Sequence, residues 1–180
     1  MTLKFIFFQM LLAILVFSLL VLNARSFYVN YFCYGANLNP SVLATRTLTA
    51  PKDLEFERAV LKDHRLCFNV GAPGLGPQAA SVVKEEGSEV HGLVYRLAPA
   101  QYALLLASEG VPLAYRARAV QVSTYSLNKR LRVQTLFAPN FSDSKEGRPS
   151  KRYLDLIVDG AREQGLSERY QELLGQVSAM

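Results

Sequence analysis

The chain has 180 residues, with 20 basic and 15 acidic side chains, two cysteines and no tryptophan. Its first 24 residues hold 19 apolar residues and a single charge, so the other 156 keep a net charge of +4 (19 basic minus 15 acidic) and an ordinary globular apolar share. These numbers exclude a disordered chain and a multi-pass membrane protein, and they leave length for one domain with a full core.

Residues 5–22 form an uninterrupted apolar run with only two polar members. A helix of that length covers about 27 Å, close to the hydrocarbon thickness of a bilayer. The run predicts an N-terminal hydrophobic helix, with residues 1–24 as a single-pass membrane anchor and residues 25–180 as the domain. A cleaved signal sequence is the main alternative, although Leu22 stands where a small residue is expected before cleavage; a buried helix of a soluble protein is the third.

The flanking charges of this run give only a small preference for one orientation. Lys4 and the amino terminus precede it, and Arg25 alone follows closely. The balance slightly favours a lumenal or extracellular domain. The triplet Asn140-Phe141-Ser142 fits an N-glycosylation acceptor, which would matter only on that side of the membrane.

The first elements of the domain have clear start and stop signals. The aromatic and β-branched stretch 27–34 predicts a strand that enters a turn, and Asn39-Pro40 predicts the N-cap and first position of a short helix around residues 41–45. Two hairpins are then expected, each with three-residue turns: strands 55–61 and 65–70 around 62–64, and strands 79–84 and 90–97 around 86–88.

Helices and a further hairpin follow. We expect a helix from Pro99 that ends at Gly110, a hairpin of strands 120–125 and 132–137, and helices over 150–164 and 167–174. Strict alternation of strands and helices is absent, which argues against a doubly wound parallel sheet. The fold class predicted is therefore α+β, a small mixed β-barrel with flanking helices.

Several sequence features do not indicate a functional site. The stretch 71–77, rich in glycine and proline, lacks the helix start and the Gly-Lys-Ser/Thr ending of a phosphate loop and is interpreted as a flexible connection. The basic pairs near 129–132 and 151–152 are interspersed with acids, so we expect a solvated surface and no nucleic-acid partner. Serine hydrolase motifs are absent.

The cysteines and histidines likewise give no site. Cys33 and Cys67 lie in apolar strand-like segments without metal-ligand spacing, so buried free thiols are favoured over a disulfide or metal ligands. His64 is expected to lie exposed in a turn, and His91 to be a packed or rim residue. No metal site is predicted.

Glu109 differs from the other carboxylates in its setting. It follows Leu104-Leu105-Leu106-Ala107-Ser108 and precedes Gly110-Val111, at an apolar helix end. Partial burial disfavours the charged form of a carboxylate, which would suit the group to proton transfer. The alternative is an ordinary acid at the end of a helix.

The turn Tyr34-Gly35-Ala36-Asn37-Leu38 is the second informative feature. Glycine and asparagine tolerate left-handed backbone angles, and consecutive N–H groups before a helix can hold an anion such as a carboxylate. Ordinary turn chemistry explains the same residues.

In order along the chain, these segments resemble the γ-glutamylcyclotransferase family and its AIG2-like relatives, from Phe27 to about Leu174. The matching segments are Tyr31 to Leu38 (family Tyr-Phe-Ala-Tyr-Gly-Ser-Asn-Leu), Val90 to Tyr95, Glu109-Gly110-Val111, Tyr115, Pro149 to Tyr153, Gly160-Ala161 and Gly165 to Tyr170. Each is weak alone, but their order and spacing make the resemblance specific.

The resemblance implies an activity that releases 5-oxoproline and a free amine or amino acid from a γ-glutamyl substrate, without a cofactor. Glu109 matches the family's catalytic glutamate and would act as general base and then acid. The substrate-binding positions carried over are Tyr31, Phe32, Cys33, Tyr34, Gly35, Ala36, Asn37 and Tyr153.

Three departures bear on the substrate. Cys33 replaces the usual alanine, Ala36 replaces a serine hydroxyl, and Thr135 stands where some members have tyrosine. A γ-glutamyl amino acid, a γ-glutamyl amine and glutathione all remain candidates. The alternative function is a catalytically silent, membrane-tethered module that binds a γ-glutamyl group or carboxylate. The sequence does not specify an oligomeric state.

Overall fold

The computed structural model describes residues 27–71, 76–127, 129–139 and 146–180. The expected anchor in residues 1–24 and the triplet Asn140-Phe141-Ser142 lie outside the described residues. Of the helices described, none is both long and apolar enough to cross a membrane.

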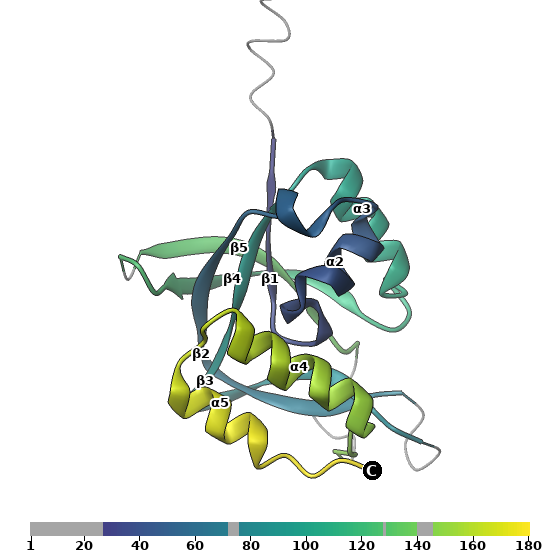
Figure 1. Ribbon diagram of the computed structural model, residues 1–180, viewed down its shortest axis with the longest axis vertical. Coiled ribbons are helices and arrows are strands. Elements are labelled where there is room, and N and C mark those ends of the chain that lie inside the picture. Colours follow the sequence, from purple (N-terminus) through teal and green to yellow (C-terminus); the bar gives the residue numbers. More distant parts are fainter. Residues whose placement is uncertain (1–26, 72–75, 128, 140–145) are drawn as a thin grey trace, which may run out of the picture.

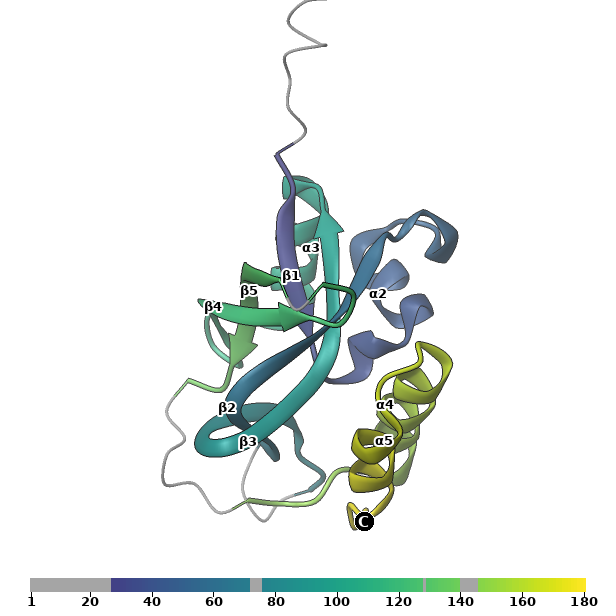
Figure 2. The same ribbon diagram turned by 90° about the vertical axis from the view of Figure 1, so that its left-hand side faces the viewer.

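Five strands close into a barrel in the order β1-β3-β2-β4-β5. β1 runs antiparallel to β3 but parallel to β5, so the sheet is mixed, as predicted. The strands are β1 (Val29–Cys33), β2 (Phe56–Val70), β3 (Ala79–Leu97), β4 (Arg116–Thr124) and β5 (Arg130–Phe137). Figure 2 shows how strongly β2 and β3 curve as they pass around the barrel.

The two hairpins predicted between residues 55 and 97 are wrong. β2 and β3 are single long strands that pair with each other from Phe56↔Tyr95 to Val70↔Ala79. The expected turns at 62–64 and 86–88 lie opposite each other within this one hairpin, where the register shifts between Lys62 and His64.

A β-bulge explains the misleading turn signals. Asp63 has a φ of 55° and Gly87 a φ of 78°, values that these residue types tolerate in turns and bulges alike. The Asp63 side chain accepts a hydrogen bond from the Gly87 backbone N–H at 3.1 Å. The two turn-like triplets therefore bend one hairpin instead of ending two.

The helices follow the sequence signals closely. Asn39 caps α2 (Pro40–Thr47) by accepting from the Ser41 N–H, and Gly110 has a φ of 68° just after α3 (Pro99–Ser108). The other helical elements are η1 (Ala36–Leu38), η2 (Pro51–Asp53), α4 (Lys151–Glu163) and α5 (Glu168–Gly175). In Figure 2, α2, α4 and α5 lie on one side of the barrel and β4 and β5 on the other.

α4 packs directly on η1, the single helical turn that follows β1 (Figure 1). Gly160 makes this approach possible, because a Cβ atom there would lie 2.8 Å from the Leu38 carbonyl carbon and 2.9 Å from the Asn39 nitrogen. The amphipathic α4 buries Leu154, Ile157, Gly160 and Ala161. This contact fixes the backbone of the turn from outside.

Gly160→Ala should destabilise the protein by about 1–3 kcal/mol, the usual cost of overpacking, since the backbone atoms that it meets cannot rotate away. Denaturant unfolding of the purified protein measures the change. The matched control is Gly175→Ala in α5, where nothing lies within 4 Å of the new Cβ. The control should leave stability unchanged or raise it by up to about 1 kcal/mol. An unchanged midpoint for Gly160→Ala would disprove the close packing.

Both cysteines are buried free thiols, as predicted: Cys33 is 2% exposed and Cys67 is 1% exposed. Burial raises the pKa of the Cys33 thiol, and it raises the pKa of the Cys67 thiol to about 12.

Neither thiol should react with a disulfide reagent in the native protein at pH 8, because a raised pKa keeps each as the unreactive thiol and burial blocks access. Both should react at once in guanidinium chloride. Counting labelled thiols by absorbance or mass checks this, and one rapidly labelled native thiol would contradict it.

Candidate active site

The turn after β1 brings polar groups to the end of a buried strand. Gly35 precedes η1, whose first backbone bonds run from the Leu38 N–H to the Gly35 carbonyl and from the Asn39 N–H to the Ala36 carbonyl. A Cβ at Gly35 would lie 3.2 Å from the Tyr153 hydroxyl, so that side chain would have to shift by a few tenths of an ångström. The side chain of Asn37 is 4% exposed and lies inside the protein beside the turn.

Glu109 is the residue at which α3 ends. Its backbone N–H still donates to the Leu105 carbonyl at 3.0 Å, and the left-handed Gly110 then turns the chain away. The Glu109 side chain is 12% exposed. A carboxylate at the C-terminal end of a helix gains nothing from the helix dipole, so its stabilisation must come from other groups.

Two side chains supply that stabilisation, and both bind the same oxygen. Asn37 Nδ2 donates to Glu109 Oε1 at 2.8 Å, and Arg46 Nη1 donates to Oε1 in an ion pair. The same Arg46 nitrogen donates to Asn37 Oδ1 at 2.7 Å, and Asn37 Nδ2 also donates to the Tyr31 hydroxyl at 3.1 Å. Oε2 of Glu109 makes no hydrogen bond to any residue that the structure describes.

The apolar setting expected for Glu109 is therefore corrected. The leucines of α3 face the core or solvent, while the carboxylate faces a guanidinium from the last turn of α2, which packs beside α3. Sequence reasoning missed Arg46. Its position in the last turn of a short helix is typical of a cation that merely complements the helix dipole, so the local pattern carried no signal of a site.

Four tyrosines surround the carboxylate and keep their hydroxyl protons. The Tyr115 hydroxyl donates to the Ala80 carbonyl at 2.8 Å, the Tyr34 hydroxyl donates to the Leu136 carbonyl, and the Tyr153 hydroxyl accepts from the Ala80 N–H at 3.1 Å. Burial is the main cause that raises the pKa of Tyr31, Tyr34, Tyr115 and Tyr153. These hydroxyls therefore stay neutral across the physiological pH range.

Together these residues line a small hollow of about 90 Å³. Its lining residues are Tyr31, Tyr34, Gly35, Ala36, Asn37, Arg46, Ala79, Ala80, Glu109, Tyr115, Leu136 and Tyr153. The structure thus brings together Glu109, Tyr153 and most of the predicted binding segment. Phe32 and Cys33 do not line the hollow, and both are buried in the hydrophobic core.

Thr135 does not line the hollow either. Its side chain is completely buried and donates to the Phe32 carbonyl at 2.7 Å, tying β5 to β1. Its neighbour Leu136 lines the hollow with an apolar side chain instead.

Ala36 lines the hollow without a hydroxyl. Within the described residues, no group of histidine, cysteine, aspartate and glutamate could hold a metal ion.

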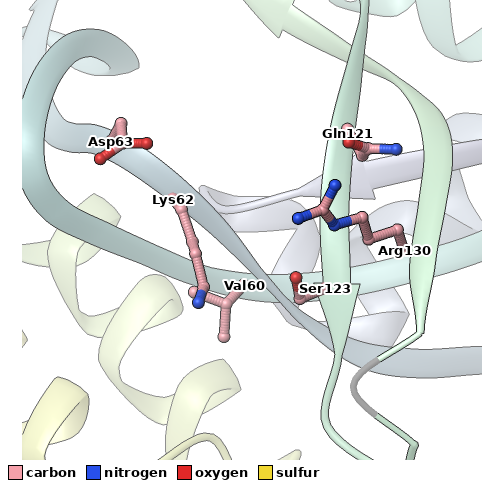
Figure 3. Close-up of a pocket in the computed structure, with 6 residues that line it drawn as sticks. All are labelled: Val60, Lys62, Asp63, Gln121, Ser123 and Arg130. Atoms are coloured by element: carbon pink, nitrogen blue, oxygen red, sulfur yellow. The ribbon is translucent and has the colours of Figure 1, made fainter.

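Larger hollows elsewhere lack this combination of groups. One of about 320 Å³ lies between β2 and β4 and is shown in Figure 3, with Lys62, Asp63 and Arg130 on its walls. Another of about 980 Å³ lies between the bent β2–β3 hairpin and α5. His91 borders it, stacked on Tyr170 with ring centroids 4.7 Å apart, and burial lowers the pKa of His91. His91 is a packed rim residue, as expected.

The chemistry available in the hollow is proton transfer. Glu109 offers one unoccupied carboxylate oxygen, held in place through the other, and the tyrosines form a partly apolar enclosure around it. A carboxylate so placed can take a proton from a nucleophile and return it to a leaving group.

Known proteins support the family resemblance. The model of the AIG2-like family matches residues 89–174. The chain is 30% identical over 150 residues to the human protein named Gamma-glutamylcyclotransferase, covering 80% of this chain and 76% of the relative. It is 30% identical over 173 residues to Gamma-glutamyl cyclotransferase gliK of Aspergillus fumigatus, covering 83% of this chain. The chain spans only 62% of that fungal protein's length.

A solved structure entitled Gamma-glutamyl cyclotransferase shares the fold. It superposes with a TM-score of 0.75 at 26% sequence identity, covering 86% of this chain and 90% of the other. The likeness of fold and the sequence similarity thus point to the same family. The chain belongs to the γ-glutamylcyclotransferase family.

Proposed function

We propose that the protein is a γ-glutamylcyclotransferase, which converts a γ-glutamyl amide into 5-oxoproline and a free amine or amino acid. The proposal rests on the placement of Glu109 in the hollow. Asn37 and Arg46 hold one of its carboxylate oxygens and leave the other free. The family relationship supports the same activity.

The proposed reaction needs no water and no cofactor. The α-amino nitrogen of the substrate attacks its own γ-carbonyl carbon and gives up a proton to Glu109 as the new C–N bond forms. The bond to the leaving nitrogen then breaks as Glu109 returns the proton to that nitrogen. Because the nucleophile is tethered to the electrophile, the protein mainly has to hold the folded-back conformer and stabilise the charge on the carbonyl oxygen.

The turn from Tyr31 to Asn37 is proposed to hold the glutamyl group. Gly35 and Ala36 line the hollow, so the backbone of the turn borders the space beside Glu109. Ala36 cannot offer the side-chain hydroxyl that a serine would, so the polar side chains that line the hollow are the neutral tyrosines together with Asn37, Arg46 and Glu109. Tyr153, which lies against Gly35, would line the same site.

Incubating the full-length protein with γ-glutamyl-alanine, γ-glutamyl-lysine and glutathione should release 5-oxoproline from at least one of them. Chromatography of the products measures the reaction and identifies the leaving group. Absence of 5-oxoproline with every substrate, from protein shown to be folded, would reject the enzyme and favour the silent binding module.

Glu109→Gln should lower kcat at least about a hundredfold, because the amide keeps the side chain's size but cannot accept and return the proton. Glu163→Gln provides the matched control, since Glu163 is an exposed glutamate at the end of α4. It should behave as the wild type. Wild-type activity in Glu109→Gln would show that another group is the acid–base catalyst.

We also propose that residues 5–22 anchor the enzyme in a membrane, with a slight preference for a lumenal or extracellular domain. The support is the apolar run itself, which is long enough to span a bilayer. A cleaved secretory signal is the alternative for the same segment.

The full chain, expressed in a eukaryotic cell, should remain in the membrane pellet after alkaline carbonate extraction, whereas a chain that begins at Arg25 should not. Glycosidase-sensitive mobility that disappears in Asn140→Gln would place the domain in the lumen. A soluble, shortened product would instead indicate a cleaved signal, and a soluble product of full length would reject the anchor.

A further inference from the structure

We propose that Arg46 is a positioning residue for the reaction, which holds the carboxylate of Glu109 so that only Oε2 faces the substrate amine. This inference rests on the proposed cyclotransferase function. It concerns a residue outside the motifs that identified the site, brought there by the packing of α2 beside α3.

The geometry of the contact is the first reason. A single nitrogen of the guanidinium, Nη1, donates both to Glu109 Oε1 and to Asn37 Oδ1. The Asn37 amide completes a closed triangle by donating to the same Oε1 at 2.8 Å. Rotation of the carboxylate about its last bond would break two hydrogen bonds at once, so the triangle holds one oxygen and fixes the direction in which the other points.

The charge balance is the second reason. Arg46 and Glu109 are the only charged side chains that line the hollow within the described residues, and they are 27% and 12% exposed. The other partners that face the carboxylate are the neutral Asn37 and the tyrosines. A partly buried carboxylate without a cation beside it would lose its ion pair and be free to turn away toward solvent. Arg46 holds it in place.

Burial of Asn37 is the third reason. The Asn37 amide uses both kinds of hydrogen-bonding atom, because Nδ2 donates to Tyr31 and Glu109 while Oδ1 accepts from Arg46. Without Arg46, the buried Oδ1 would lose its partner and the amide would be free to reorient. The loss of Arg46 would therefore disturb both groups that orient Glu109.

A competing role exists, because Arg46 also lines the hollow and could bind the α-carboxylate of the substrate directly. Steady-state kinetics can distinguish the two roles. A group that binds the substrate mainly raises KM when it is removed, whereas a group that orients the base lowers kcat and leaves KM nearly unchanged.

Steady-state kinetics of Arg46→Met, with the best substrate found for the wild type, provides the test. We expect kcat to fall about a hundredfold and KM to change less than threefold. Arg46→Lys, which restores a cation and a donor, should recover at least tenfold of the lost kcat. Arg162→Met, an exposed arginine paired with Asp159 on α4, is the matched control and should behave as the wild type.

A rise in KM with unchanged kcat would overturn the proposal in favour of substrate binding, and unchanged kinetics would overturn it outright. Inactivity of the wild type would reject the proposed function first. Thermal unfolding of Arg46→Met, Glu109→Gln and the double variant then still reports on the contact. If the two residues depend on each other, the double variant should be no less stable than the less stable of the two single variants. If the double variant loses the sum of the two single losses in stability, the contact between Arg46 and Glu109 is contradicted.

Discussion

The side-chain amide of Asn37 connects two neighbouring elements with a third that lies 72 residues away in sequence. It reaches Tyr31 in β1, Arg46 in α2 and Glu109 at the end of α3, and it does so from a buried position in η1. A buried amide must satisfy its donors and its acceptor inside the protein, so the arrangement of these three partners is constrained by one small group. Asn37 and its three partners all line the hollow.

The barrel supplies the rigid frame for this arrangement. Gly92 in β3 lets β1 approach so closely that a Cβ there would lie 2.1 Å from the Cys33 carbonyl oxygen. On the outer side, Gly160 lets α4 lie on the backbone of η1. The turn after β1 is thus held between a strand contact and a helix contact, each of which requires a glycine. Such close backbone approaches leave little freedom for the turn to rearrange.

Most polar groups in the hollow are neutral, because burial keeps the tyrosine hydroxyls protonated. Four tyrosines and one ion pair share a small hollow whose other walls are glycine, alanine, leucine and Asn37. Burial raises the pKa of each tyrosine, which keeps these groups as neutral donors and acceptors around the single carboxylate. An enclosure of this kind suits a reaction in which one proton moves between two nitrogens of the same substrate.

Local signals in the sequence determined much of the fold and part of the site. The N-cap at Asn39, the left-handed Gly110 and the amphipathic pattern of α4 all act through neighbours a few residues away, so the helices were predicted nearly to their ends. The turn after β1 and Glu109 were found through the family motifs. The β4–β5 hairpin was also predicted correctly.

Only the tertiary structure decided the rest. The residues around Asp63 and Gly87 have the same backbone requirements in a turn and in a bulge, so only the pairing of β2 with β3 distinguished one bent hairpin from two short ones. Arg46 resembles any cation at a helix end until α2 packs beside α3. The sequence by itself indicated Glu109 as the candidate acid–base residue, because its motif is local. Its contact with Arg46 joins residues 63 positions apart, which no local pattern encodes.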